Sequence, residues 1–296
     1  METPLALPLP QLAKGRFPFS ERGAAASGAV SAYTDERLFS AVGVRVGFTL
    51  RDGGASAAPY DSLNLGTHVK DDPDAVAENR RRVLAAFGVP DAPLLVPNQV
   101  HGDTVTVVGP AEAGNLDSVR TRIAQGTDAL VVGAAHTAAL LCYADCVPLV
   151  LVAPHGTFAV VHAGWRGVDN GIAVKALGLL LEADGSSDAA QVNVYRGPYI
   201  HRECFETGPE VYDRFVAQFG AVAAYGPDHI DLGACLDAAL VRAGVDARRI
   251  ADVDRCTVCH NDEWFSYRAQ GGVCGRHGAF ACRMPRTQET ASHPSL

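Results

Sequence analysis

Short, unbroken apolar runs dominate the middle of the chain, and apolar runs of this length are typical of buried β-strands. They occupy residues 94–96, 104–108, 129–132, 138–143, 147–152 and 158–162. Residues 44–50 alternate between apolar and polar positions and also predict a strand, which ends at the paired glycines 53 and 54. Two more strands are predicted at 192–195 and 279–283.

Helical periodicity appears in four other segments. Asp72 and Pro73 form a good helix start, with aspartate at the cap and proline at the first helical position, and Gly88 ends that helix. The other helices are predicted at 172–182, 209–219 and 232–243.

These elements predict a mixed α/β fold. Strands recur too densely for simple βαβ alternation, and residues 42–283 contain no stretch of linker composition, so we expect a single domain of mixed β-sheets covered by outer helices. Residues 1–41 are rich in Pro, Ala, Gly and Ser, most of all at 23–28, and we expect a poorly ordered leader there. Residues 284–296 are polar and are interpreted as a C-terminal tail.

Composition narrows the possible partners and the compartment. The 296 residues carry a net charge of −8 and are 48% hydrophobic, which disfavours nucleic acid or an anionic membrane as a partner and leaves a small-molecule site open. A chain of this size does not need its eight cysteines as a disulfide framework, and residues 1–19 contain no apolar run of signal-peptide length. We therefore expect reduced thiols and a cytoplasmic protein.

Three residues at the ends of apolar strands are candidate metal ligands: His101, Cys146 and His162. Two imidazoles and a thiolate suit Zn²⁺, whose catalytic sites have three protein ligands and one open position. The alternatives are histidines with structural roles, since the three residues lack the spacing of a compact metal motif, and a nucleophilic triad with Cys146 as nucleophile. Two histidines around one thiol favour the metal over the triad, because a triad needs only one histidine.

The residues beside these ligands add further candidates. Arg166 lies between two glycines after a predicted strand and before a helix, where it could hold phosphate or a carboxylate; the alternative is a glycine turn with Trp165 packed in the core. Asp145 could transfer protons beside a metal, or it could be a hydrogen-bonded turn residue.

Cys256 and Cys259 have the C-x₂-C spacing of a zinc knuckle. A structural site usually pairs one knuckle with another, and Cys274 and Cys282 do not have that spacing. We therefore expect Cys146 to be the metal-ligating thiol and the other cysteines to be mostly structural.

Several motifs together resemble one family. These are T-L-R-D-G-G-A-S at 49–56, S-L-N-L-G at 62–66, E-N-R at 78–80, N-Q-V-H-G at 98–102, A-D-C-V-P at 144–148, H-A-G-W-R-G at 162–167, F-S-Y-R at 265–268 and G-R at 275–276. The chain is similar over about residues 44–283 to the YfiH/YlmD-like laccase-domain family. The resemblance implies a layered α/β/β/α arrangement of helices and sheets.

The resemblance also implies an activity. Members of the family are purine nucleoside enzymes that cleave adenosine, inosine and 5′-methylthioadenosine with phosphate and deaminate adenosine, and their zinc ligands correspond to His101, Cys146 and His162. In deamination, water activated by zinc would attack purine C6, with Asp145 as proton shuttle. Arg51 and Arg166 are the candidates for gripping phosphate.

Asn64 and Gln99 are the candidates for hydrogen bonds to ribose or base. The expected partners are therefore a purine nucleoside and phosphate, with no nucleic acid and no membrane, in a monomer or a homodimer.

The family carries two other activities, and a non-enzymatic metal-binding role stays open beside them. A copper-dependent polyphenol oxidase would need several coppers and many histidines, although copper could replace zinc at a single site of nitrogen and sulfur ligands. A cytoplasmic amidase that edits peptidoglycan precursors could use the same zinc. The segment at 199–204 departs from the family pattern around Cys204, which leaves the role of that loop open.

Overall fold

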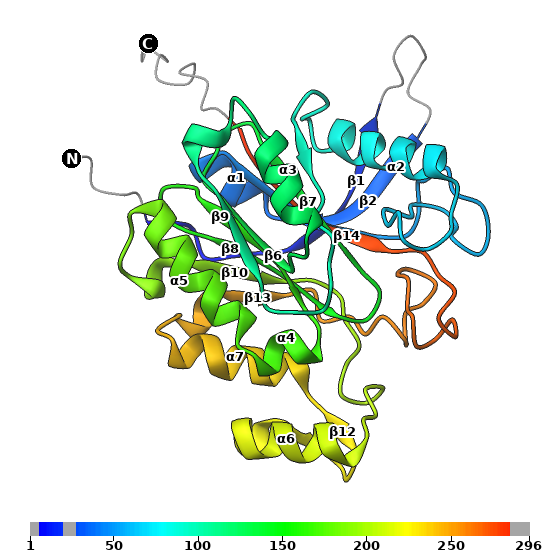
Figure 1. Ribbon diagram of the computed structural model, residues 1–296, viewed down its shortest axis with the longest axis vertical. Coiled ribbons are helices and arrows are strands. Elements are labelled where there is room, and N and C mark those ends of the chain that lie inside the picture. The colour runs from blue at the N-terminus through cyan, green and yellow to red at the C-terminus, as the bar shows by residue number, and fades with distance from the viewer. Residues whose placement is uncertain (1–5, 20–27, 285–296) are drawn as a thin grey trace, which may run out of the picture.

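The computed structural model describes residues 6–19 and 28–284, and these form two stacked sheets with helices on both outer faces (Figure 1). In order across the first sheet, the strands are β1 (Ala13–Phe19), β2 (Gly28–Thr34), β3 (Val44–Thr49), β14 (His277–Arg283), β7 (Ala138–Tyr143) and β4 (Leu94–Leu95). Across the second they are β13 (Ile250–Asp252), β10 (Asn193–Arg196), β8 (Val147–Val152), β9 (Phe158–Ala163), β6 (Ala129–Val132) and β5 (Val105–Val108). A short hairpin pairs β11 (Ala224–Tyr225) with β12 (His229–Ile230).

The helices are α1 (Glu36–Val42), α2 (Pro73–Ala86), α3 (Asp117–Ala124), α4 (Trp165–Asp169), α5 (Ile172–Asp184), α6 (Pro209–Phe219) and α7 (Leu232–Arg242). Helix α2 packs Val83 on the outer face of the first sheet. Helices α5 and α7 pack Leu177 and Leu236 against the outer face of the second sheet. The layered α/β/β/α arrangement and the mixed α/β fold are therefore confirmed.

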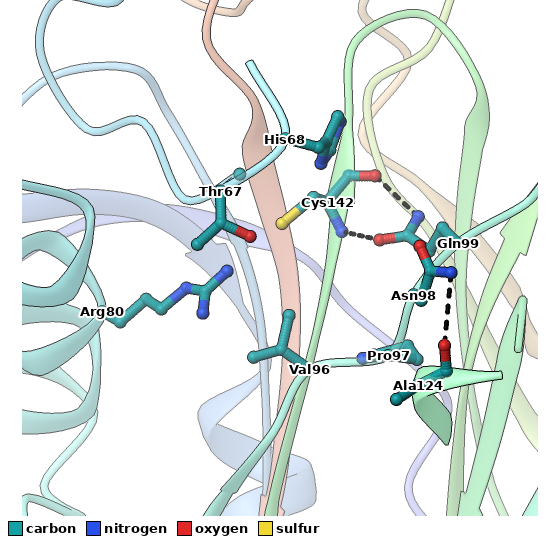
Figure 2. Close-up of a pocket in the computed structure, with 10 residues that line it drawn as sticks. Thr67, His68, Arg80, Val96, Pro97, Asn98, Gln99, Ala124 and Cys142 are labelled. Atoms are coloured by element: carbon teal, nitrogen blue, oxygen red, sulfur yellow. Dashed lines mark hydrogen bonds between the residues drawn. The ribbon is translucent and has the colours of Figure 1, made fainter. Parts of the chain in front are cut away.

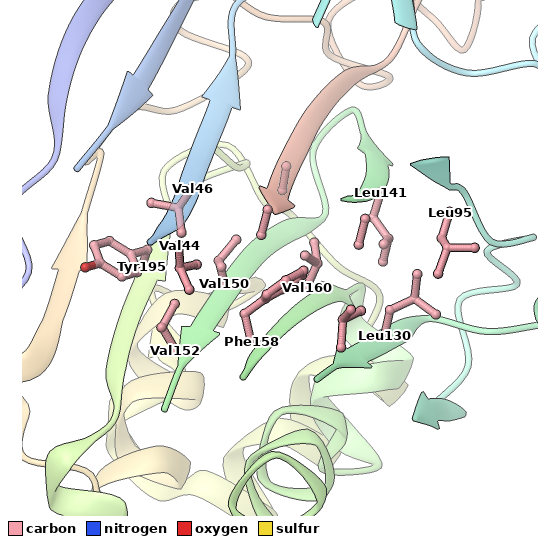
Figure 3. Close-up of a cluster of buried hydrophobic side chains, with 14 of the residues drawn as sticks. Val44, Val46, Leu95, Leu130, Leu141, Val150, Val152, Phe158, Val160 and Tyr195 are labelled. Carbon is pink, nitrogen blue, oxygen red and sulfur yellow. The ribbon is translucent and has the colours of Figure 1, made fainter. Parts of the chain in front are cut away.

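The main core lies between the two sheets. Side chains from β3 and β7, such as Val46 and Leu141, meet Val150 and Val160 from β8 and β9, and all four are fully buried (Figure 3). Because both faces of β7, β8 and β9 are covered, these strands have the unbroken apolar sequences from which they were predicted.

The expectation of a poorly ordered leader is wrong for the part of it that the structure describes. Strands β1 and β2 pair along seven residues each and extend the first sheet, and Asp35 caps α1 by accepting bonds from the backbone N–H groups of Arg37 and Leu38. Upstream, Leu7 is 3% exposed. An edge strand such as β1 buries few of its side chains, so its sequence lacks the apolar run that marks an inner strand.

Other expectations about the chain ends have different outcomes. Of the segment 23–28, only Gly28 is among the described residues, and it begins β2; of the predicted tail, only Met284 is described. No element was predicted at α3, at β13 or at the β11–β12 hairpin. Within the described residues, no helix combines the length and apolarity needed to cross a bilayer.

Candidate metal centre and cavity

The three predicted ligands converge where the two sheets meet. His101 lies on the connection from β4 to β5 and Cys146 on the connection from β7 to β8, so both are on chain segments that pass from the first sheet to the second. His162 lies within β9, opposite Pro148 of β8, which brings it beside Cys146. The imidazole nitrogens and the Cys146 Sγ that could bind an ion all lie within 4.8 Å of one another.

Asp128, immediately before β6, fixes two of these ligands. Its carboxylate accepts hydrogen bonds from the backbone N–H groups of Val100, His101 and Gly102 at 2.8–3.2 Å. The same carboxylate lies 2.8 Å from Nδ1 of His162 and is fully buried. Since Nδ1 is engaged in this way, Nε2 of His162 is the nitrogen left to bind an ion.

The backbone around the ligands is closely constrained. His101 and Asp145 have φ values of 60° and 91°, a region that residues with a Cβ rarely adopt. Gly164 allows the turn before α4 to approach the ligands, because a Cβ there would lie 3.2 Å from Cys146 Sγ and 3.3 Å from His101 Cδ2. The glycine turn thus keeps the space among the three ligands open.

The charges of the ligands are coupled. Burial alone would raise the pKa of Cys146, but the charge of His162 and hydrogen bonds from His101 and His162 lower it to about 6. Burial alone would lower the pKa of His162, but the Cys146 thiolate and the hydrogen bond to Asp128 raise it to about 9. A thiolate beside two imidazoles is a donor set that fits Zn²⁺, and Cu ions also bind such nitrogen and sulfur ligands.

A cavity of about 560 Å³ opens over the three ligands. It combines aromatic rings with positive charge, and its other lining residues include His68, Gln99, Asp145, Trp165, Arg166, Phe205, Tyr267, Arg268 and Arg276. Burial and the neighbouring charge of Arg276 lower the pKa of His68. The size falls within the range of small-molecule sites.

A second cavity of about 220 Å³ shares His68, Gln99 and Cys142 with the first (Figure 2). The side-chain amide of Gln99 donates to the backbone oxygen of Cys142 and accepts from its N–H, both at 2.8 Å. Thr67 and Arg80 line the other side of this space. Gln99 therefore reaches both cavities, with its amide already bonded to β7.

Asp145 and Arg166, two of the predicted catalytic residues, are brought to the larger cavity. The carboxylate of Asp145 accepts bonds from Thr257 Oγ1 and from the backbone N–H of Arg268, each at 2.7 Å. The guanidinium of Arg166 lies over the Trp165 ring at 4.2 Å, and Trp165 is half-buried against the core of the second sheet. Trp165 is therefore packed only in part, and the binding of an anion by Arg166 stays a prediction.

Arg51 and Asn64 do not line either cavity. Arg51 donates to the backbone oxygens of Asp61 and Asn261 at 3.0 and 2.7 Å and lies over the Phe265 ring. Asn64 is fully buried and bonds to the backbone of Gly66 and to Asp71. Their placement does not support the predicted contacts with phosphate, ribose or base, because both side chains are used to hold loops.

Residues of the site that had no role in the sequence interpretation include Asp128, His68, Arg268 and Arg276. Asp128 carried a usable signal, since an aspartate directly before a fully apolar strand must find partners when it is buried. Arg268 and Arg276 were quoted only as parts of motifs. His68 lies in a loop whose sequence has no distinctive pattern.

Comparisons with known proteins show the family of the chain. A profile of the family described as multi-copper polyphenol oxidoreductase laccase matches residues 45–284. The chain is 32% identical over 249 residues to purine nucleoside phosphorylase YlmD of Geobacillus stearothermophilus, covering 81% of this chain and 90% of the relative. It is 34% identical over 243 residues to purine nucleoside phosphorylase YfiH of Escherichia coli, covering 80% and 93%.

Solved structures show the same fold. The crystal structure of YlmD from Geobacillus stearothermophilus matches with a TM-score of 0.73 at 32% identity, over 82% of this chain and 93% of that one. A Bacillus licheniformis hypothetical protein, YfiH, also matches with a TM-score of 0.73, at 27% identity, over 87% and 97%.

Proposed function

The chain belongs to the multi-copper polyphenol oxidoreductase laccase family, and from this premise we propose that it is a zinc-dependent purine nucleoside phosphorylase that also deaminates adenosine. The names of the relatives support the nucleoside phosphorylase activity. The observation that carries the proposal is the larger cavity, in which His101, Cys146 and His162 lie beside aromatic rings and guanidinium groups. Adenosine, inosine and 5′-methylthioadenosine are the proposed substrates.

The lining of the cavity matches the parts of such a substrate. Trp165, Phe205 and Tyr267 offer flat apolar surface for a purine. Arg166 and Arg276 line the cavity with guanidinium groups, which bind phosphate oxygens in pairs. Arg276 Nη1 also donates to the backbone oxygens of Cys274 and Gly275 at 2.8 and 2.9 Å, but unlike Arg51 this side chain lies at the cavity. Arg276 takes the place in this proposal that the sequence had suggested for Arg51.

In phosphorolysis, a phosphate oxygen forms a bond to ribose C1′ while the C1′–N9 bond breaks. The electron pair of that bond goes to the purine, which leaves as the free base after taking a proton, and the sugar leaves as ribose 1-phosphate. We assign the arginines to holding the phosphate close to C1′, where positive charge develops. Asp145 is proposed to supply the proton that the purine takes up. It lines the cavity, and its carboxylate is held in place by hydrogen bonds from Thr257 and Arg268.

In deamination, water adds its oxygen to purine C6, the C6–N6 bond breaks, and ammonia leaves with the transferred protons. Asp145 is proposed to take a proton from the water and return it to the departing nitrogen. When bound by His101, Cys146 and His162, zinc supplies Lewis-acid polarisation and makes water easier to deprotonate. Asp128 orients His162 for this role.

The test uses purified protein of known zinc content with adenosine. Adenine and ribose 1-phosphate should form only when phosphate is present, and inosine and ammonia should form without it. Replacing Arg276 with glutamine should raise the KM for phosphate and leave deamination unchanged. Absence of both products at full zinc occupancy would overturn the proposal.

Two further assays test the alternatives. The protein loaded with copper is given a catechol and oxygen, and the protein loaded with zinc is given UDP-muramoyl-serine. Faster turnover of the catechol, or release of L-serine faster than adenosine turnover, would replace the nucleoside proposal with a polyphenol oxidase or an amidase.

A further inference from the structure

Three cysteines outside the site already described lie together on one side of the molecule. The Sγ atoms of Cys204, Cys256 and Cys259 are all within 4.8 Å of one another, and those of Cys204 and Cys259 are 3.6 Å apart. Cys204 comes from the loop after β10, whereas the other two come from the loop after β13. The sequence argument against a zinc knuckle had considered only downstream partners, and the structure supplies Cys204 instead.

Backbone contacts hold the two loops in register at this cluster. Tyr199 and Cys256 form an isolated parallel bridge, and the Thr257 N–H donates to the Tyr199 oxygen at 2.9 Å. The N–H of His201 donates to Cys256 Sγ at 3.4 Å. Backbone N–H groups directed at sulfur stabilise thiolate ligands in metal sites, as hydrogen bonds to metal ligands generally do.

The exposure of the three thiols suits a site that an ion can reach. Cys256 is buried, Cys204 is half-buried and Cys259 is exposed, so the cluster opens to solvent on one side. Three thiolates select thiophilic ions such as Zn²⁺ or Cu⁺, and the open side leaves a position for a solvent ligand on zinc.

The geometry points to a second metal site, formed by Cys204, Cys256 and Cys259, that takes a thiophilic d¹⁰ ion and fastens the two loops together. The loops carry one wall of the larger cavity. Phe205 follows Cys204 directly and lines that cavity, and Arg268 donates to the backbone oxygens of Cys204 and Glu206 at 3.1 Å. Thr257, which lies between the two later cysteines, holds the Asp145 carboxylate. An ion at the cluster would therefore act on the cavity by positioning its wall.

The test is a metal titration of the full chain, stripped of metal and kept reduced. Zinc stoichiometry is measured by mass spectrometry of the metal, and Cd²⁺ serves as a second probe, because each cadmium–thiolate bond adds ultraviolet absorbance. The wild type should bind about two ions per chain at saturation, one at each site. Cys146→Ser should keep the cluster's ion and most of the cadmium–thiolate absorbance, whereas Cys259→Ser should keep the other ion and lose most of that absorbance.

A control variant and a proteolysis experiment test whether the ion binds at the cluster. Cys235→Ala removes a buried thiol of α7 that belongs to neither group and should leave the stoichiometry at the wild-type value. Zinc should also slow proteolysis between residues 254 and 272 in the wild type and in Cys146→Ser, but not in Cys259→Ser. Cys259 is exposed, so this variant should fold, which circular dichroism would check.

Binding of a single ion that Cys146→Ser abolishes, or unchanged stoichiometry in Cys259→Ser, would overturn the proposal. So would a Cys204–Cys259 disulfide that persists in the reduced preparation, because it would remove two of the three ligands.

Discussion

The carboxylate of Asp128 contacts both histidines of the site. It accepts hydrogen bonds from three backbone N–H groups, including that of His101, and it lies beside Nδ1 of His162. Asp128→Asn keeps the shape of the side chain but turns an amide N–H₂ toward groups that are themselves donors. We expect zinc affinity to fall by about 10–100-fold, as is common when a hydrogen-bond partner of a metal ligand is lost. Competition with a chromophoric chelator measures this.

Asp103→Asn is the matched control, because Asp103 lies two residues after His101 but pairs with Lys175 at the surface. Equal zinc affinity in Asp128→Asn and in the wild type would show that the carboxylate does not orient His162.

Cys146 should be unusually reactive in the protein without metal. Its pKa of about 6 keeps the thiol ionised at neutral pH, whereas an ordinary cysteine thiol has a pKa of about 8.5. Alkylation by iodoacetamide, followed at residue 146 by mass spectrometry, should slow as the pH falls through about 6. His162→Ala should move this midpoint upward, because burial then acts without the opposing positive charge. A midpoint near that of an ordinary thiol in the wild type would contradict the charge coupling.

At the scale of elements, the N-terminal segment before β1 is part of the fold. Leu7 lies in the core between the sheets, and its backbone oxygen accepts a bond from Arg249 Nη1 at 3.1 Å. Leu9, two residues later, is 48% exposed. Leu7→Ala should lower the free energy of unfolding by about 2–3 kcal/mol, and Leu9→Ala by less than about 0.5 kcal/mol. Urea denaturation compares the two, and equal effects would mean that the segment does not pack as described.

This segment also shows where inference from sequence succeeds and fails. Inner strands such as β7 and β8 were predicted to the residue, because full burial on both faces requires an apolar run. Strand β1 is an edge strand with one buried side chain, so nothing in its composition separates it from a loop. Helix α6 was predicted with its correct bounds because Pro209 and Gly220 mark its two ends.

The site divides in a similar way. His101, Cys146 and His162 could be proposed from residue type and position at strand ends, and the structure brings them together. The roles of Arg51 and Asn64 could not be decided, because a polar side chain that holds a loop has the same sequence as one that holds a ligand. Cys204 could not be joined to Cys256 and Cys259 either, since that contact depends on two loops meeting.

At the scale of the whole molecule, stability should depend on one histidine far from the surface. His277 of β14 is fully buried, and burial lowers its pKa to about 3. In the unfolded chain histidine takes up a proton near pH 6.5, so the unfolded state binds more protons as the pH falls from about 6.5 to about 3. The free energy of unfolding should therefore decrease over this range, by up to about 1.4 kcal/mol per pH unit from this residue.

His277→Leu removes that contribution. Urea denaturation at several pH values compares the free energies of unfolding of the two proteins. Above pH 7 they should differ by a constant amount that reflects packing, and below pH 7 the difference should change in favour of the variant. Parallel curves for the two proteins across the acid range would show that His277 is not kept neutral by the fold.

The position of the three ligands relative to the sheets has a consequence for assembly of the protein. His101 and Cys146 lie on the two chain segments that leave the first sheet for the second, and His162 belongs to the second sheet itself. A folding intermediate that had formed only the first sheet would lack His162 and the Asp128 carboxylate that holds the backbone of His101. The chemistry of the site is therefore acquired only once the second sheet has formed, and an ion bound there would stabilise the folded protein, because it would bind the folded state and not an intermediate without that sheet.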